Sequence, residues 1–264
     1  MYKGFREITE GELANYYQDF DNLHPKENEF FILEKGEKLR YKQEEFRNVI
    51  VKRIKSETTE VTHRNSGQEM ALDLLLDDDV KLVALTGKAG CGKTYLAAQI
   101  GLHKVVDKKK YDKLFFVRNN VEIAKSLGAL PGEKFDKIKP YMSSIVDQLG
   151  GWDIVEYLTE YSCKLEAEAL GFMQGRSLNN TFIIVDEAQN LTVPQVKMLA
   201  TRVAEGSKMV MAGDLQQAAN DTFQNGNSGL KTLIEKFCGH RLFGFLELQE
   251  SERSELAQLA ADLL

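Results

Sequence analysis

The feature that most constrains the fold is an eight-residue run that directly follows the short apolar segment 82–85. It reads Gly87-Lys88-Ala89-Gly90-Cys91-Gly92-Lys93-Thr94. Glycines at these positions let successive backbone N–H groups point at one anion, because no Cβ crowds the approach. Where a helix begins at such a run, its free N–H groups and the positive end of its dipole face the same anion. The run therefore predicts a phosphate-binding loop between a buried strand and a helix.

The side chains at the end of this run predict which phosphate ligand is bound. Lys93 is expected to reach the β- and γ-phosphates of a nucleoside triphosphate, and Thr94 is expected to be a ligand of Mg²⁺. The spacing matches the full pattern GxxxxGK[ST], so we expect ATP with magnesium. The alternative is a chance glycine turn, which the strand before the run and the helix after it disfavour.

Apolar strands and helical patterns alternate along most of the chain. Strands are predicted at 82–85, 114–117, 182–185, 208–212 and 243–248, and helices at 68–76, 93–104 and 194–203. Continuous apolar strands separated by helices indicate a mostly parallel sheet that is covered on both faces. The predicted fold class is therefore α/β.

The first 64 residues differ from the rest, because they are rich in charged and aromatic residues and lack long apolar runs. Residues 29–33 and 37–41 predict a hairpin with Gly36 in its turn, and residues 43–57 carry apolar side chains at helical spacing. We expect a small β-containing appendage over 1–64, with a helix at 43–57, followed by the main domain over 65–264.

Composition limits the class of protein. The chain has 264 residues, of which 43% are hydrophobic and 28% charged, which is ordinary for a globular protein. No stretch is apolar enough to span a membrane and the N-terminus has no apolar leader, so a cytoplasmic protein without a membrane partner is expected. Cys91, Cys163 and Cys238 are far apart and encode neither a zinc cage nor a disulfide framework.

Polar residues follow two of the later strands. Asp186 and Glu187 come after 182–185, where Asp186 would hold the magnesium shell and Glu187 would orient and deprotonate the attacking water. The alternative is an acidic pair that caps the next helix. After 208–212 comes Gly213-Asp214 with Gln217, and Gln217 can reach the γ-phosphate, although Gly-Asp after a strand is commonly a turn.

These motifs resemble those of known proteins. Asp186-Glu187-Ala188-Gln189 and Gly213-Asp214-x-x-Gln217 resemble motifs II and III of superfamily 1 helicases. The chain is more similar to the PhoH family of phosphate-starvation-inducible P-loop ATPases, over about residues 65 to 255. Further matching text is Asn65-x-x-Gln68, Leu127-Gly128-Ala129-Leu130-Pro131-Gly132, Lys137, Pro140-Tyr141, Gly175-Arg176-Ser177-Leu178, Lys197-Met198, Thr201-Arg202 and Ser228-Gly229-Leu230.

The resemblance implies a RecA-like P-loop NTPase core that hydrolyses ATP and acts in a helicase-like manner. It implies that Gln68 reads the adenine edge and that Asn65 helps to position it, the alternative being helix capping or solvent exposure. The chain departs from the family at Cys91, where threonine is usual, at Asn119, where the family has proline, and at Gln174, where it has arginine. A PIN nuclease domain, which some relatives carry, is not expected here.

Superfamily 1 helicases place ATP between two RecA-like lobes, and this sequence encodes one. By hypothesis a neighbouring subunit supplies the missing face, which makes a closed ring, and the resemblance suggests a homo-oligomeric hexamer. Candidate arginine fingers are Arg253, Arg202 and Arg176. An arginine in an acidic run, such as Arg253, is also a common surface ion pair.

Charge is unevenly distributed. Residues 102–144 contain ten Lys or Arg against five Asp or Glu, a net charge of +5. The whole chain has a net charge of −6, so the remaining residues carry −11. Candidate contacts to RNA or single-stranded DNA are Arg118, Lys134, Lys137 and Lys139. The alternative is a solvated helix face. Two functions stay open: an ATPase that remodels nucleic acid, and a ring ATPase or nucleotide switch that acts on a protein partner.

Overall fold

A six-stranded sheet forms the centre of the protein. The computed structural model describes residues 2–18, 23–56, 59–118, 136, 139, 142–143, 145–173, 175–217 and 228–251. The strand order is β12-β7-β11-β10-β8-β9, and every neighbouring pair is parallel. This confirms the predicted α/β fold. The strands are β7 (Leu82–Gly87), β8 (Lys113–Arg118), β9 (Leu165–Ala169), β10 (Thr181–Asp186), β11 (Lys208–Gly213) and β12 (Phe243–Leu248).

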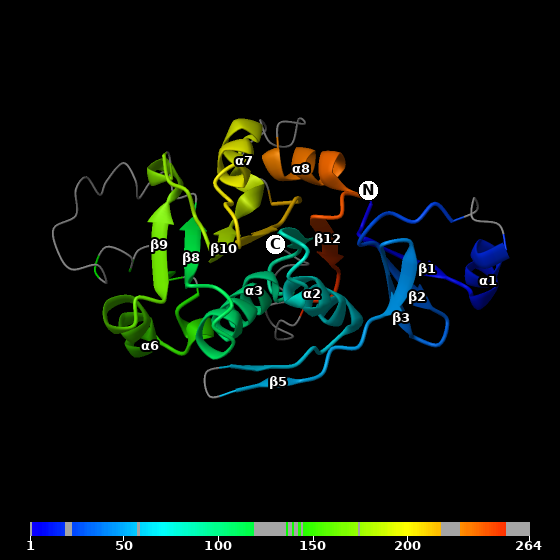
Figure 1. Cartoon of the computed structure of the whole chain (residues 1–264), viewed down its shortest axis with the longest axis horizontal. Coiled ribbons are helices and arrows are strands. Elements are labelled where there is room, and N and C mark those ends of the chain that lie inside the picture. Colours follow the sequence, from blue (N-terminus) through cyan, green and yellow to red (C-terminus); the bar gives the residue numbers. More distant parts are fainter. Residues whose placement is uncertain are drawn as a thin grey trace, which may run out of the picture.

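Helices cover both faces of this sheet (Figure 1). Helices α2 (Ser66–Leu76) and α3 (Lys93–Leu102) lie on one face, and α7 (Val193–Ala200) and α8 (Gly229–Phe237) lie on the other. Successive strand residues point to opposite faces. Accordingly, Val83 and Leu85 pack in the core with α2 and α3, whereas Ala84 packs in the core with α7 and α8.

Shorter elements complete the main domain. The chain passes from α3 into a π-helical turn at His103–Asp107, and from α6 (Trp152–Glu156) into another at Tyr157–Tyr161. Single 3-10 turns lie at Asp147–Leu149, Leu170–Phe172 and Ala188–Asn190. The last of these follows β10 directly, so it lies at the carboxyl end of the sheet.

The topology gathers three loops at one edge. In the register of the sheet, β11 lies between β7 and β10, with Met211 opposite both Ala84 and Val185. Because all three strands are parallel, the loops that follow them leave from the same edge of the sheet, where ligands of open α/β sheets bind. These loops carry the sequence motifs that start at Gly87, Asp186 and Gly213.

The N-terminal region forms a separate four-stranded sheet in the order β1-β2-β3-β4. Its elements are β1 (Phe5–Ile8), α1 (Glu10–Gln18), β2 (Phe30–Leu33), β3 (Lys38–Lys42) and β4 (Glu45–Asn48). It has a small core of its own, in which Phe31 is fully buried among Ile8, Tyr16 and Leu39. The predicted hairpin over 29–41 is confirmed as β2 and β3.

The helix predicted at 43–57 is wrong. Gln43 and Glu44 have φ values of 54° and 65°, and they form a tight turn that leads β3 into β4. Phe46 then pairs with Tyr41 across the hairpin. Farther on, β5 (Ile54–Lys55) pairs with β6 (Glu60–Val61). The apolar residues at 46, 49, 50 and 54 imitate helical spacing, but left-handed residues at the turn and β-branched residues after it favour strands.

A row of ion pairs joins this region to helix α2. Lys38 Nζ lies 2.9 Å from Glu69 Oε2, and Arg40 Nη1 lies 2.5 Å from Asp73 Oδ2. Arg40 also pairs with Asp77, which accepts a 2.7 Å bond from Lys42 Nζ. We call these side chains the α2 ion-pair row. They hold β3 along the helix that precedes β7.

The N-terminal segment also lies along the outer edge of β12. The Lys3 carbonyl accepts a 2.8 Å hydrogen bond from the Glu247 N–H, and the Asn28 side chain donates to the Phe243 carbonyl at 2.9 Å. The edge of the central sheet that is nearest to β7 is therefore covered. None of the helices in the described part of the chain has the length and apolar character that a membrane span requires.

Candidate functional site

The loop after β7 has the geometry of an anion site. Gly87 has a φ of 138°, and a Cβ there would lie 2.2 Å from the Leu248 carbonyl, so only glycine fits. Helix α3 begins at Lys93, and its N-cap Gly92 offers no side chain to the first N–H groups. These N–H groups and the helix dipole are thus left for an anion in front of the loop.

Lys93 lies over this loop. Its Nζ donates to the carbonyl of Gly87 at 2.7 Å and to that of Lys88 at 2.9 Å. Both acceptors are neutral backbone oxygens, so no carboxylate neutralises the ammonium through these bonds. The charge is therefore available to a phosphate.

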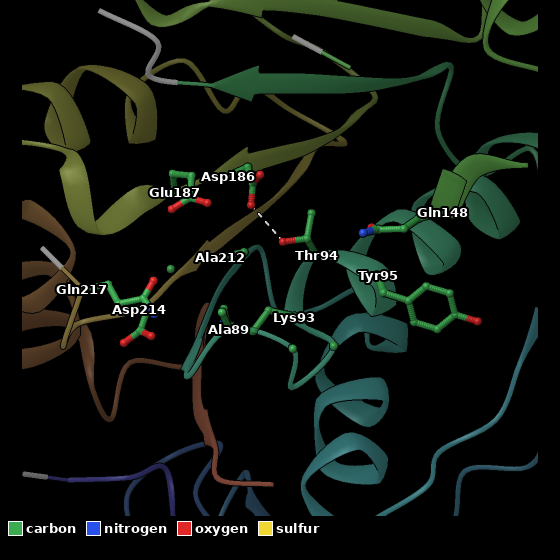
Figure 2. A pocket seen from close by; sticks show the side chains of 13 residues that line it. Ala89, Lys93, Thr94, Tyr95, Gln148, Asp186, Glu187, Ala212, Asp214 and Gln217 are labelled. Carbon is green, nitrogen blue, oxygen red and sulfur yellow. Dashed lines mark hydrogen bonds between the residues drawn. The ribbon is translucent and has the colours of Figure 1, made fainter. Parts of the chain in front are cut away.

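Thr94 and Asp186 connect the loop to strand β10. The Thr94 hydroxyl donates to Asp186 Oδ1 at 2.8 Å (Figure 2). Asp186 is 6% exposed, and its burial raises the pKa of the carboxyl more than the bond from Thr94 lowers it. Hydroxyl and carboxylate oxygens at this separation are the ligands that Mg²⁺ prefers. The residues present therefore fit a magnesium ion.

Other metal ligands are scarce around this pair. Over the described ranges, no group of three or more His, Cys, Asp or Glu side chains could hold a metal ion. A magnesium ion at Thr94 and Asp186 would therefore complete its shell with phosphate oxygens and water, as is usual for sites that bind a nucleotide.

Glu187 stands beside this pair in an unusual backbone conformation. Its φ is 54° and its ψ is 37°, in the left-handed region, and its side chain is 44% exposed. Its Oε1 lies 4.0 Å from Nη2 of Arg118, the last residue of β8. Glu187 occupies the N-cap position of the 3-10 turn Ala188–Asn190, but its side chain makes no capping hydrogen bond there, and α7 is capped by Thr192 and Gln195.

One cavity of about 230 Å³ joins these groups. Figure 2 shows that Lys93, Thr94, Glu187 and Gln217 surround it together, although they come from different loops. Gln217, for which the sequence predicts a contact with the γ-phosphate, lines this cavity. Its lining residues are Ala89, Gly90, Gly92, Lys93, Thr94, Tyr95, Gln148, Asp186, Glu187, Ala212, Gly213, Asp214 and Gln217.

Sequence reasoning gave no site role to Tyr95, Gln148 or Asp214. Tyr95 comes directly after Thr94, and Asp214 lies within the Gly-Asp motif, so both could have been included by position. Gln148 follows no motif. It is brought to the cavity by the 3-10 turn at Asp147–Leu149, whose Gln148 carbonyl accepts a hydrogen bond from Gln99 of α3.

Gln68 and Asn65 lie on the other side of the loop. Asn65 caps α2 by accepting a 2.9 Å bond from the Gln68 N–H. The Gln68 side chain is 5% exposed, so it is not at the surface. It donates to the Cys91 carbonyl at 3.4 Å and accepts from the Arg64 N–H at 2.9 Å. Gln68 therefore contacts the phosphate loop from beneath.

Neither of the two described candidates for an arginine finger, Arg176 and Arg202, lines this cavity. Arg176 pairs with Glu166 and Glu168 of β9, at 3.0 and 2.6 Å, and Arg202 follows α7. Arg253 lies outside the described residues.

Two of the candidate nucleic-acid contacts, Arg118 and Lys139, belong to the described residues. Arg118 is next to Glu187, and Lys139 pairs with Asp136 at 2.9 Å, while Lys134 and Lys137 lie outside the described residues. Within the same basic stretch, Lys104 is buried and bonded to the Leu76 carbonyl at 2.7 Å and to Asp78. Lys104 is therefore not part of a strand-binding surface.

Two solved helicase structures align with parts of this chain. The Pif1 helicase from Candida albicans is 17% identical, with a TM-score of 0.40 over 76% of this chain and 43% of that one. A Bacteroides Pif1 bound to single-stranded DNA is also 17% identical, with a TM-score of 0.38 over 76% of this chain and 45% of that one.

Sequence relatives are much more similar. Protein PhoH2 of Bacillus subtilis (strain 168) is 45% identical over 207 residues, which are 76% of this chain and 47% of that protein. A PhoH-like protein of the same strain is 34% identical over 221 residues, or 83% of this chain and 67% of that protein. The chain thus spans about half the length of its PhoH2 relatives, 47% and 46% for the Bacillus and Mycolicibacterium smegmatis proteins. Residues 60–264 match the family described as PhoH-like protein, and the chain belongs to this PhoH family.

Proposed function

We propose that this protein is a magnesium-dependent ATPase that couples hydrolysis to the remodelling of RNA or single-stranded DNA. The observation that carries the proposal is the bond between Thr94 and Asp186, beside a loop of free N–H groups and beside Glu187. If Asp186 served only the stability of the fold, we would expect a basic side chain to neutralise its carboxylate. Here the two oxygen ligands face the cavity that Lys93 also lines.

The chain's own groups would bind and orient the triphosphate. The N–H groups of the loop and of the α3 N-terminus would hold the β-phosphate, and Lys93 would turn from the Gly87 carbonyl to the β- and γ-phosphates. Thr94 and Asp186 would hold magnesium, which when bound neutralises charge that develops on the phosphates. Gln68 would read the adenine from beneath the loop, with Asn65 fixing the start of α2.

Glu187 would act on the attacking water. Its Oε2 is bonded to Gln189, so Oε1, 4.0 Å from Arg118, would accept the water's proton while the water aligns with the γ-phosphate. Gln217 lines the same cavity and would contact the γ-phosphate. Hydrolysis would then change the surroundings of both Glu187 and Gln217, which lie beside that phosphate.

Arg118 gives the proposed link to nucleic acid. It lies at the end of β8 beside Glu187, and the chain continues from it into the basic stretch that contains Lys134, Lys137 and Lys139. A phosphate backbone bound along that stretch would compete for the Arg118 guanidinium. Binding of a nucleic-acid strand would thereby change the contact between Arg118 and Glu187.

The proposal includes a homo-oligomer in the cytoplasm. The described residues supply one parallel sheet, so charge on the transferred phosphate would be met by an arginine of a neighbouring copy in a ring, which we expect to be hexameric. Arg253 and Arg202 are the candidates for this finger. A monomer with full turnover, found by mass measurement in the presence of ATP, would contradict the ring.

Turnover with and without nucleic acid tests the proposal. We expect magnesium-dependent ATP hydrolysis that RNA or single-stranded DNA stimulates, with stimulation falling as salt rises. Glu187→Gln should bind a fluorescent ATP analogue normally and not hydrolyse ATP. Wild-type hydrolysis by Glu187→Gln would refute the assignment of the base, and absence of turnover in the wild type would refute the proposed activity.

The second candidate is a ring ATPase or nucleotide switch that acts on a protein. It is favoured by the pairing of lysines in the basic stretch, since Lys113 bonds to Glu166, Lys139 bonds to Asp136, and Lys104 is buried. Changing Lys134, Lys137 and Lys139 together to Glu separates the candidates. Loss of stimulation at an intact basal rate supports a strand-binding stretch, whereas joint loss of assembly and basal rate supports a subunit or protein contact.

A further inference from the structure

Gln189 lies between Glu187 and the end of β11, and both ends of its side-chain amide are bonded. Its Nε2 donates to Glu187 Oε2 at 2.6 Å, and its Oε1 accepts from the Asp214 N–H at 3.0 Å. The residue is 2% exposed. Because one atom of the amide can only donate and the other can only accept, a single orientation of the side chain satisfies both partners.

The fold leaves space for this amide at one glycine. A Cβ on Gly213 would lie 2.7 Å from Gln189 Oε1 and 2.9 Å from the Gln189 backbone nitrogen, closer than side chains pack. Gly213 ends β11 immediately before Asp214. The glycine of the Gly-Asp motif therefore permits the close approach of Gln189 to the Asp214 N–H.

The bond from Gln189 decides how the Glu187 carboxylate is presented. Oε2 is occupied by the amide, and Oε1 remains on the side of Arg118, 4.0 Å away. Glu187 has a half-exposed side chain, and its contact with Arg118 is long, so a short hydrogen bond is needed to select one rotamer of the carboxylate. Gln189 supplies that selection and keeps one oxygen open toward the cavity.

The other end of the amide reaches the loop that carries Gln217. Within this loop, the Gln216 N–H donates to Asp214 Oδ1 at 2.9 Å and the Gln217 N–H donates to the Asp214 carbonyl at 3.1 Å. Asp214 is thus the common anchor of the turn. A shift of Gln217 would be transmitted through Asp214 to the amide of Gln189, and from there to Glu187.

We propose that Gln189 is a positioning residue that fixes the carboxylate of Glu187 and couples it to the loop Gly213–Gln217. Glu187 would then be aligned for catalysis only while that loop holds this arrangement, so contact of Gln217 with the γ-phosphate and alignment of the base occur together. The inference rests on the proposed ATPase activity and adds to it a residue that does not touch the nucleotide.

Three variants test the coupling, with one control. Gln189→Met keeps the volume and removes both bonds, and Gln189→Glu keeps the acceptor for the Asp214 N–H and repels Glu187. Gly213→Ala leaves the amide chemically unchanged but displaces it, and also crowds the Gln189 backbone nitrogen and Leu230. Gln195→Met is the matched control, because Gln195 serves only the capping box of α7. For each protein we would measure kcat, KM, affinity for a fluorescent ATP analogue, and the thermal midpoint.

The expected result is a fall in kcat by up to about 100-fold in the three variants, with nucleotide affinity nearly unchanged, since a misplaced base slows only the chemical step. Gln195→Met should lower the thermal midpoint without a change in kcat per folded molecule. The double variant Glu187→Gln with Gln189→Met should be no slower than Glu187→Gln alone, because Gln189 acts through Glu187.

Two outcomes would overturn the coupling. Wild-type kcat in Gln189→Met, beside an inactive Glu187→Gln in the same assay, would refute the role of Gln189 and leave the proposed ATPase in place. Equal losses of kcat, nucleotide affinity and thermal midpoint would show a structural role only. A wild-type protein that does not hydrolyse ATP at all would instead refute the proposed function, and with it the base that Gln189 is proposed to align.

Discussion

Two clusters of charged side chains differ in how far their charges are paired: the α2 ion-pair row, between β3 and α2, and the phosphate site at the start of α3. In the α2 ion-pair row, burial alone would raise the pKa of Asp77, but bonds from Lys42, the Asp79 N–H and Arg40 outweigh it and hold the pKa well below its usual value. Among the described residues, Asp186 at the phosphate site forms no salt bridge, and burial raises the pKa of its carboxyl more than Thr94 and the more distant Arg118 lower it. One cluster is neutralised within the fold, and the other is left for a ligand.

The spacing of the residues explains why every base in the α2 ion-pair row meets an acid. Lys38, Arg40 and Lys42 lie on one face of β3, and four strand residues span about 13 Å. Glu69, Asp73 and Asp77 lie on one face of α2, and eight helix residues span about 12 Å. The two repeats match, so each base meets an acid. The phosphate site has no matching partner of this kind among the described residues.

The largest effect is expected from a substitution in the unpaired cluster at the phosphate site. Lys93→Ala should lower ATP turnover by on the order of 10²–10³-fold or more, because the cation that meets the developing phosphate charge is lost. Its thermal midpoint should stay near that of the wild type, since the contacts of Lys93 Nζ, to the Gly87 and Lys88 carbonyls and to the Cys91 sulfur, all lie within its own loop. Steady-state kinetics and thermal unfolding on one preparation check both. A large loss of stability would contradict the comparison.

The next largest effect is expected from a substitution in the α2 ion-pair row. Arg40→Met should lower the free energy of unfolding by about 3 kcal/mol, because the carboxylates of Asp73 and Asp77 stay buried with one cation fewer. Urea denaturation measures this change. Arg47→Met is the control, since Arg47 pairs with an exposed Glu45 at 3.6 Å and should change stability little. Equal effects of the two substitutions would refute the importance of burial.

A fall in pH should weaken the α2 ion-pair row and the neighbouring contacts of Asp78. Burial would raise the pKa of Asp78, but bonds from Lys104 and Tyr111 lower it below its usual value, as the partners of Asp77 do. Carboxyls with a depressed folded-state pKa contribute stability that is present above their unfolded pKa, about 3.9, and that is lost as pH falls further. Asp73, whose pKa is raised by burial, has the opposite trend and offsets part of the loss.

Urea midpoints between pH 6 and pH 3 measure this dependence. We expect the loss of stability below about pH 4 to be smaller in Asp78→Asn than in the wild type, because the substituted side chain no longer takes up a proton. A pH dependence that is identical in both proteins would contradict the assignment.

The smallest effect compares two ion pairs of one strand region. Lys38→Ala should lower the free energy of unfolding by about 1 kcal/mol, since Lys38 and Glu69 have side chains only 16% and 12% exposed. Lys35→Ala should cause no measurable change, because its pair with Glu10 is exposed on both sides, at 73% and 53%. A double-mutant cycle for each pair separates the pair energy from the loss of side-chain packing.

The central sheet could be predicted because its buried strands are continuous apolar runs and its loop has a fixed spacing of glycines. β9 was missed because its sequence, Leu165–Ala169, alternates apolar residues with glutamates, as an edge strand with one polar face does. The glutamates pair with Lys113 and Arg176, which are distant in sequence. Local patterns carry no signal for such pairs.

The same limit applies to the site. Lys93, Thr94, Asp186 and Gln217 could be placed from motifs, because parallel strands bring their loops to one edge. The amide of Gln189 could not, since its role depends on the absence of a Cβ at Gly213, 24 residues later in the chain. Likewise, helical spacing in 43–57 was misleading because two left-handed residues reverse the chain at Gln43 and Glu44.

The contact between Lys3 and β12 has a consequence for how the protein can be shortened. A chain cut at residue 65 would keep every motif but would bare the outer hydrogen-bonding groups of β12, including the Glu247 N–H and the Phe243 carbonyl. A bare edge strand invites another molecule to add its own strand there. The N-terminal segment thus protects the central sheet against intermolecular pairing, and we expect a chain trimmed in this way to aggregate.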